Sequence, residues 1–279
     1  MEQSSLYVVA TPIGNLADIT LRALDVLKRC DVIAAEDTRN ALHLLKHHGI
    51  DTRVISLHEH NERTAAYKLV DLLAQGKSIA LITDAGTPAI SDPGALAVCA
   101  VREAGYPVVP IPGANAAICA LSAAGITAPH FLFYGFLPQQ AAARKRELEA
   151  LKASPYLLVF YEAPHRVAAS IAAMAEVLGD RTVTIARELT KLFETMHRCA
   201  LGEAAAWFEA DANQLKGEFV LLVEGAPTAA APDAVALTHV LEVLMRELSL
   251  KQAVKLATEL TGARKNDVYE LALALGKGA

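Results

Sequence analysis

Short apolar runs alternate with segments of helical periodicity through the first half of the chain. Residues 19–29 place Leu21, Leu24 and Leu27 at helical spacing, which predicts a helix. The apolar runs are rich in β-branched and aliphatic residues, which favour strands. The predicted strands are residues 6–10, 32–35, 54–57, 79–83 and 108–111. Strands that alternate with helices in this way predict a mostly parallel sheet.

A second group of strands and helices begins near Phe131. Its predicted strands are residues 131–134, 157–161, 182–185 and 219–223, and its predicted helices include residues 144–152 and 167–178. This pattern indicates a second α/β domain. We therefore assign residues 1–118 to the first domain and residues 119–226 to the second.

The composition changes after the second domain. Residues 226–233 read APTAAAPD, which is typical of a linker. Three helical segments follow, with Thr261-Gly262 as a short turn between the last two, an arrangement consistent with a helix-turn-helix. The predicted helices are residues 234–247, 251–260 and 265–275. Residues 233–279 are thus predicted to form a small helical domain.

Composition and charge narrow the class of protein. With 53% apolar and 20% charged residues the chain is globular, and with 5% aromatics its core must consist mainly of aliphatic side chains. Residues 104–143 carry no charge and are long enough to span a bilayer, but five prolines interrupt them, so no membrane span is expected. Without a signal-peptide pattern, we expect a cytoplasmic protein. The four widely spaced cysteines indicate free thiols.

Glycine- and proline-rich turns follow three of the first-domain strands, where parallel sheets bind ligands. They are Thr11-Pro12-Ile13-Gly14, the segment from Asp84 to Gly94, and Pro112-Gly113-Ala114-Asn115-Ala116. The second segment displays many backbone N–H and C=O groups, which suits a nucleoside cofactor. Asp84 is either an acceptor for that ligand or a cap of its own turn. Neither GxGxxG nor GxxxxGK[ST] occurs, which disfavours a dinucleotide-dependent oxidoreductase and excludes an ordinary P-loop.

Eight motifs along the chain resemble those of the tetrapyrrole-methylase superfamily. In order they are VATPIGNL, AAEDTR, DAGTPAISDPG, IPGANAA, GFLP, FYEAPHR, ARELTK and KGEFVLLVEG. The resemblance covers residues 6–275 and is strongest to the branch that methylates a cytidine ribose 2′-hydroxyl in small-subunit ribosomal RNA. The segment from Asp233 onward also resembles the helical extension of that branch.

This resemblance implies two α/β domains of tetrapyrrole-methylase type, with S-adenosylmethionine in the cleft between them, and a homodimer. It further implies 2′-O-methylation of a cytidine in the decoding region of small-subunit ribosomal RNA, with that RNA, either free or in the assembled subunit, as partner. Carried over motif by motif, the residues expected to bind the cofactor are Pro12, Asp84, Ala85, Gly86, Thr87, Pro88, Ala114, Asn115, Ala116, Tyr161, Gly217, Glu218 and Phe219.

A ribose hydroxyl is a weak nucleophile, so a general base is useful for its methylation. We predict Asp37 as this base, because it follows a predicted strand and resembles in position an acidic residue implicated in catalysis in tetrapyrrole-modifying relatives. Glu36 is the alternative base. In a purely structural interpretation, Glu36 pairs with Arg39 and Asp37 caps the next helix. Arg39 is otherwise predicted to hold an RNA phosphate.

For several other polar and charged residues, the sequence does not decide between a functional and a structural role. His58 and His60 lack further ligands at metal-site spacing, and methyl transfer needs no metal, so we expect none. The pairs Tyr161-Glu162 with His165-Arg166, and Arg187-Glu188 with Lys191, either line the acceptor cleft or form structural ion pairs.

The net charge of −5 does not favour RNA, so RNA contacts must be local. The residues predicted to make them are Arg39, Arg144, Lys145, Arg146, Lys251, Lys255, Arg264 and Lys265. Two other functions fit the sequence: methylation of a small tetrapyrrole, which does not need the helical tail, and non-enzymatic nucleic-acid binding with a nucleoside ligand.

Overall fold

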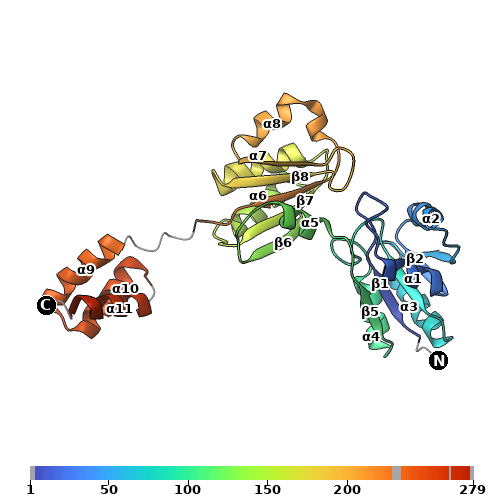
Figure 1. The fold of residues 1–279 in the computed structure, drawn as a ribbon, viewed down its shortest axis with the longest axis horizontal. Helices are drawn as coiled ribbons and strands as arrows, with labels where there is room; N and C mark the ends of the chain where they lie inside the picture. Colours follow the sequence, from blue (N-terminus) through green and yellow to red (C-terminus); the bar gives the residue numbers. More distant parts are fainter. Residues whose placement is uncertain (1–3, 228–233, 264, 277–279) are drawn as a thin grey trace. The chain divides into compact units, whose positions relative to one another are not determined.

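The computed structural model describes residues 4–227, 234–263 and 265–276. These residues group into two compact units, one within residues 1–225 and one within residues 226–279 (Figure 1). The first unit contains two five-stranded sheets, and the second is helical. The fold class predicted from the sequence, two α/β domains followed by a small helical domain, is confirmed.

The first sheet is entirely parallel, in the order β3-β2-β4-β1-β5. Its strands are β1 (Leu6–Val9), β2 (Val32–Ala35), β3 (Val54–Ser56), β4 (Ile79–Ile82) and β5 (Val108–Ile111). Its helices are α1 (Leu21–Arg29), α2 (Thr38–His47), α3 (Glu62–Ala74) and α4 (Ala95–Glu103). The predicted strands and the parallel arrangement are confirmed. His58 and His60 lie in the turn after β3.

Both faces of the first sheet are buried, which explains why its strands are almost uninterrupted apolar runs. On one face Ile33 and Ala35 pack with α1 and α2, whereas on the other Ala34 packs with α3 and α4. The helices change face because the chain reverses its direction across the sheet after β3, and right-handed crossovers then place α3 and α4 on the opposite side. All parallel strands therefore deliver their carboxyl ends to one edge.

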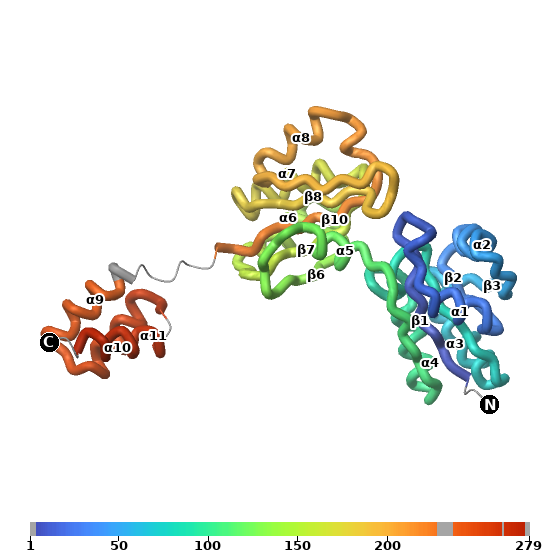
Figure 2. The backbone as a smooth tube through the Cα atoms, viewed as in Figure 1, coloured from blue at the N-terminus to red at the C-terminus, as the bar shows by residue number. Residues whose placement is uncertain are grey.

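The second sheet is mixed, in the order β6-β7-β10-β8-β9, with only β6 and β7 parallel. Figure 2 follows the chain through β7, β10 and β8 at its centre. Its strands are β6 (Phe131–Phe136), β7 (Leu157–Glu162), β8 (Thr182–Arg187), β9 (Thr195–Ala200) and β10 (Phe219–Val223). The helical segments of this half are α5 (Ala116–Ala123), α6 (Ala141–Leu151), α7 (Val167–Leu178), α8 (Ala204–Ala210) and the 3₁₀ turn Ala212–Leu215.

Helix α5 belongs by packing to the second sheet. Ala117 and Ala120 are buried against Leu157, Val159 and Leu222 on one face, while α6, α7 and α8 cover the other. The change from one sheet to the other therefore comes before Ala116, whereas the boundary predicted at residue 118 falls inside this helix.

The helical unit has a core of its own. Helices α9 (Ala234–Glu247), α10 (Leu250–Thr261) and α11 (Lys265–Gly276) bury Leu241, Val254 and Val268 together. Ser249 and Gln252 form a capping box at the start of α10, and Gly262 (φ 69°) ends the helix in the left-handed conformation that glycine adopts most easily. The short turn predicted at Thr261-Gly262 is confirmed.

Buried Glu62 fixes the start of α4. Its Oε1 accepts the N–H groups of Gly94 and Leu96, both at 2.8 Å, and of Ala97 at 3.3 Å. These donors belong to the first turn of the helix, which has no backbone acceptors of its own. Glu62 therefore anchors the far end of the long loop that leaves β4.

We predict that Glu62→Ala lowers the free energy of unfolding by about 1–3 kcal/mol, because buried N–H donors lose their acceptor. Urea unfolding at neutral pH measures the change. Glu103→Ala, at an exposed position at the end of α4, is the control and should change stability by less than about 0.5 kcal/mol. Equal stabilities of the two variants would contradict this role of Glu62.

Candidate functional site

One cavity of about 340 Å³ lies where loops of the two sheets of the first unit meet. Loops after β1, β2, β4 and β5 line one side, and the ends of β6, β7, β8 and β10 line the other. Its lining residues are Ile13, Glu36, Asp84, Ala85, Gly86, Thr87, Ile90, Ser91, Asp92, Asn115, Ala116, Phe136, Tyr161, Glu162, Ala163, Pro164, Leu189, Lys191, Glu218, Phe219 and Val220.

Backbone pairing between two loops supports the first side of the cavity. The N–H of Thr11 donates to Gly86 O at 2.9 Å, and the N–H of Gly86 donates to Thr11 O at 3.0 Å. Gly86 has φ 78°, which glycine adopts without strain. The Thr87 hydroxyl donates to Ala114 O at 3.1 Å, which joins the loop after β4 to the loop after β5.

Glu36 and Asp84 hold each other beside the cavity. The N–H of Asp84 donates to Glu36 Oε2 at 3.4 Å, while the carboxylate of Asp84 accepts the N–H of Asp37 at 3.1 Å and the side-chain amide of Asn40 at 2.8 Å. Asp84 thus binds the start of α2 as well as facing the cavity. Burial, followed by the neighbouring Asp84 and Asp37 charges, raises the pKa of Glu36.

Asp37 has a different position from Glu36. It is the N-cap of α2, its Oδ1 accepts the N–H of Arg39 at 2.8 Å, and its Oδ2 pairs with the Arg39 guanidinium at 2.6 Å. Hydrogen bonds from the Arg39 side chain and backbone lower the pKa of Asp37 to about 2. It is absent from the cavity lining, whereas Glu36 lines the cavity. The capping role follows the structural interpretation, but Asp37, not Glu36, is the partner of Arg39.

The second sheet contributes an aromatic wall. The Tyr161 hydroxyl accepts the N–H of Ala117 at 3.2 Å, in the first turn of α5, and the Tyr161 ring lies edge-on to Phe136 with centroids 5.7 Å apart. Burial raises the pKa of Tyr161, which keeps the phenol neutral. Glu162 is buried and also lines the cavity, and it accepts the Ser170 hydroxyl at 2.5 Å and pairs with Arg166 at 3.1 Å. The Glu162–Arg166 ion pair therefore borders the cavity.

Asp92 is the main cavity residue that the sequence did not single out. Burial, followed by the charges of Glu36, Asp84 and Glu218, raises its pKa to about 6. In the same loop, Ala89 and Ser91 have φ 67° and 66°, a conformation that is uncommon for residues other than glycine. The only available signal was its place in the motif SDPG, at the end of the loop that carries Asp84.

Most of the residues expected to bind the cofactor do line the cavity. The exceptions are Pro12, Pro88, Ala114 and Gly217, each of which is next in sequence to a lining residue. Pro12 and Pro88 are buried, so they stabilise the loops without facing the cavity.

The predicted RNA contacts are spread over both units. Arg39, Lys145, Arg146, Lys251, Lys255 and Lys265 are exposed. Lys145 pairs with Glu176 at 2.7 Å. Arg144 is buried and donates to Gln139 O at 3.4 Å, so in this structure it supports α6 and presents no surface to RNA. Arg264 lies outside the described residues.

Within residues 4–227, 234–263 and 265–276, no three His, Cys, Asp or Glu side chains converge on a point that would hold a metal ion. Of the helices in the same ranges, none has the length and apolar character needed to cross a bilayer.

Comparison with known proteins identifies the class. Residues 5–205 match the model of the tetrapyrrole (corrin/porphyrin) methylases, and residues 231–276 match the RsmI C-terminal HTH domain. The solved structure of the methyltransferase CobJ superimposes with a TM-score of 0.60 at 16% identity, covering 80% of this chain and 95% of that one. The fold is thus that of the tetrapyrrole methylases.

Two relatives narrow this class. The chain is 49% identical over 272 residues to ribosomal RNA small subunit methyltransferase I of Escherichia coli O157:H7, covering 97% of this chain and 95% of the relative. It is 48% identical over 276 residues to the protein of the same name from Pseudomonas aeruginosa, covering 98% of each. The chain therefore belongs to the tetrapyrrole methylase family, and the resemblance seen in its motifs is confirmed.

The raised pKa of Asp92 predicts a pH dependence of stability. Because the folded state holds this proton more tightly than the unfolded state, in which the pKa is near 4, the stability contributed by Asp92 falls as pH rises from about 4 to 6. Asp92→Asn removes the titration. The urea midpoint of Asp92→Asn minus that of the wild type should therefore increase from pH 4 to 6 and level off above. A difference that does not change with pH would contradict the burial of this charge.

Proposed function

We propose that this chain is an S-adenosylmethionine-dependent methyltransferase that methylates the ribose 2′-hydroxyl of a cytidine in the decoding region of small-subunit ribosomal RNA. The observation that carries the proposal is a carboxylate-lined cavity at the edge of a parallel sheet, in a chain that also has the helical domain of its ribosomal RNA methyltransferase relatives. A small tetrapyrrole as substrate would leave the helical domain without a role.

The cavity suits this methyl donor. Its volume lies within the range of about 300–1,000 Å³ that is usual for small-molecule sites. Ile13, Phe136 and Leu189 offer apolar surface for an adenine ring, whereas Glu36, Asp92 and Glu218 provide negative charge for the sulfonium and amino groups. The bound donor supplies an activated methyl group, so the protein needs only to orient the acceptor and remove its proton.

Thr87→Arg tests the placement of the donor. The longer side chain would occupy the cavity and break the hydrogen bond from Thr87 to Ala114. We expect at least a tenfold loss of affinity for S-adenosylhomocysteine in calorimetry. Thr64→Arg, at an exposed position on α3, should bind as the wild type does. Undiminished affinity in Thr87→Arg would move the donor site elsewhere.

Glu36 is proposed to accept the proton of the ribose hydroxyl. Its burial in the cavity raises its pKa, whereas the Arg39 contact lowers the pKa of Asp37, so Glu36 is the stronger base of the two. We predict that Glu36→Gln lowers the single-turnover rate by about 10²-fold or more. Asp37→Asn, which retains a good helix cap, should stay within a few-fold of the wild-type rate. The opposite ranking would return the role to Asp37.

The helical unit is proposed to bring the RNA to the cavity. Lys251 and Lys255 are exposed one turn apart on α10, and Lys265 is exposed at the start of α11, which gives a local surface for phosphates. Arg39, Lys145 and Arg146 are proposed as further contacts on the first unit. We predict that deletion of residues 232–279 raises KM for small subunits at least tenfold and leaves S-adenosylhomocysteine affinity unchanged. Full efficiency of the truncated enzyme would make the tail only structural.

The function itself is tested with methyl-labelled S-adenosylmethionine and small subunits from a strain that lacks the enzyme, followed by mapping of the labelled nucleotide. A 2′-O-methyl group blocks alkaline cleavage at its own phosphodiester, whereas a base methyl group does not. Free ribosomal RNA as a second substrate separates recognition of sequence from recognition of the assembled subunit. Absence of transfer would favour a binding protein, and transfer to a tetrapyrrole alone would favour the small-molecule alternative.

We further propose a homodimer that acts in the cytoplasm. Exposed apolar side chains on the first unit, among them Leu21, Leu96 and Ile118, offer surface for such an interface. Light scattering at micromolar concentration should give twice the mass of the chain, and a monomer would contradict the dimer.

A further inference from the structure

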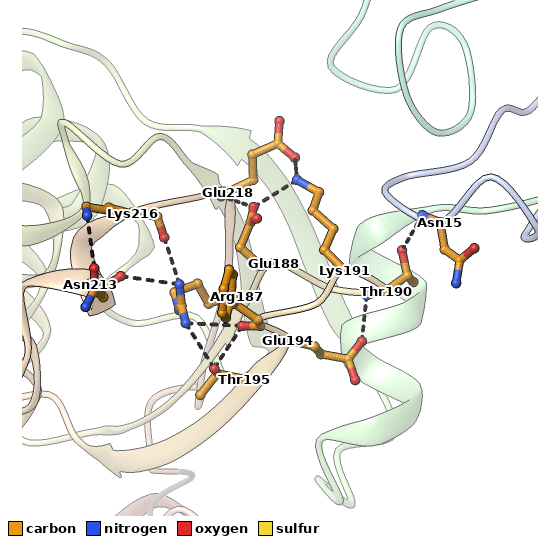
Figure 3. A network of polar contacts seen from close by, with 11 residues as sticks. Asn15, Arg187, Glu188, Thr190, Lys191, Glu194, Thr195, Asn213, Lys216 and Glu218 are labelled. Carbon is orange, nitrogen blue, oxygen red and sulfur yellow. Dashed lines mark hydrogen bonds and ion pairs between the residues drawn. The ribbon is translucent and has the colours of Figure 1, made fainter. Parts of the chain in front are cut away.

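Lys191 occupies a fixed position at the edge of the cavity. Its Nζ lies 2.8 Å from Glu188 Oε1 and 2.8 Å from Glu218 Oε2, and the side chain lines the cavity together with Glu218 (Figure 3). Glu188 Oε1 also accepts the N–H of Glu218 at 3.0 Å. The ammonium is therefore held between two carboxylates, one of which is fixed by the backbone.

Two glycines make room for this arrangement. A Cβ on Gly14 would lie 2.5 Å from Lys191 Cγ, and a Cβ on Gly217 would lie 2.3 Å from Glu188 Cγ. Both distances are shorter than real contacts allow. The glycines of the motifs TPIGN and KGEF thus let the lysine stem and the glutamate lie directly on the backbone.

The loop that carries Lys191 is strained as well as hydrogen-bonded. Glu188 and Thr190 have φ 51° and 67°, a left-handed conformation that is unfavourable for residues other than glycine. The loop is held by the N–H of Asn15, which donates to Thr190 Oγ1 at 3.1 Å, and by Glu194 Oε2, which accepts the N–H of Thr190 at 2.6 Å (Figure 3). Strain that is retained in this way is typical of functional loops.

The charge of Lys191 limits what it can do. Burial alone would lower its pKa, but the hydrogen bonds to Glu188 and Glu218 outweigh burial and raise the pKa of Lys191. It is therefore an ammonium at neutral pH and acts as a donor, not as a base. An ammonium has three N–H donors. Two have carboxylate partners, and among the residues that the structure describes the third has none.

We propose that Lys191 is a further catalytic residue, whose third N–H donates to the acceptor hydroxyl oxygen of the substrate. The proposal rests on the proposed function. During transfer the O–CH₃ bond forms, the S–CH₃ bond breaks to leave a neutral thioether, and the hydroxyl proton passes to Glu36. Negative charge that develops on the oxygen is stabilised by the adjacent ammonium. Glu188 is then a positioning residue that acts through Lys191.

Lys191→Met tests this role, because it removes the ammonium but keeps an unbranched stem on Gly14. We expect the single-turnover rate on small subunits, with both substrates saturating, to fall by about 10²-fold, as when one donor to a developing oxyanion is lost. Lys191→Arg should recover part of the rate. S-Adenosylhomocysteine affinity and the thermal midpoint should stay close to those of the wild type.

Two matched variants complete the test. Lys152→Met removes an exposed lysine that pairs with Glu149 away from the cavity, and should have the wild-type rate. Glu188→Gln keeps an acceptor for the N–H of Glu218 but loses the charge that holds Lys191. It should lower the rate less than Lys191→Met does, with KM unchanged.

The proposal is overturned if Lys191→Met retains a rate within twofold of the wild type. It is also overturned if S-adenosylhomocysteine affinity falls in parallel with the rate, because Lys191 would then serve the donor site or the fold. The wild type is assayed first on the same subunits. Failure of the wild type rejects the proposed function, whereas failure of the lysine prediction in an active enzyme rejects only the role of Lys191.

Discussion

The backbone pairing of Thr11 with Gly86 is the contact on which the rest of the site depends. Parallel strands exchange their backbone hydrogen bonds only within the sheet, so the loops that leave them must find other partners for their N–H and C=O groups. Thr11 and Gly86 satisfy each other just beyond β1 and β4. This pairing places Ile13 and the segment from Asp84 to Thr87 at one edge of the sheet, where both loops line the cavity.

The cavity gathers negative charge in a place where water is partly excluded. Glu36 and Asp92 both have raised pKa values, first because of burial and then because of neighbouring carboxylates. Several carboxylates placed close together repel one another and so oppose folding. Groups whose pKa values are perturbed in this way cluster at functional sites. The proposed methyl donor is cationic, and in the proposed function its sulfonium and amino groups neutralise these carboxylates. Lys191 brings the single lysine ammonium of the cavity lining, balanced by Glu188 and Glu218.

The sequence predicts the fold well because a parallel sheet that is buried on both faces requires continuous apolar strands, which are easy to detect. Strand β9 escaped prediction because it is an edge strand with the mixed sequence TMHRCA. The positions of the individual side chains at the site were predicted less well than the fold. Whether Glu36 or Asp37 enters the cavity depends on one residue of register at the start of α2, and the burial of Arg144 depends on how α6 packs. Neither is visible in a motif.

The negative net charge of the chain can be explained when the two binding tasks of the proposed function, the methyl donor and the RNA, are considered separately. A site for a cationic donor is best acidic, whereas a polyanionic RNA is attracted by basic surface. Both cannot be optimal on one small surface. The tail from Pro232 has equal numbers of acidic and basic residues, so the whole net charge of −5 falls on the rest of the chain. In the proposed function, Lys251, Lys255 and Lys265 attract RNA on a helical unit that is covalently linked to the unit with the acidic cavity, and this linkage raises the effective concentration of the RNA. Because attraction by the tail need only exceed local repulsion by the cavity, the chain as a whole has no need to be basic.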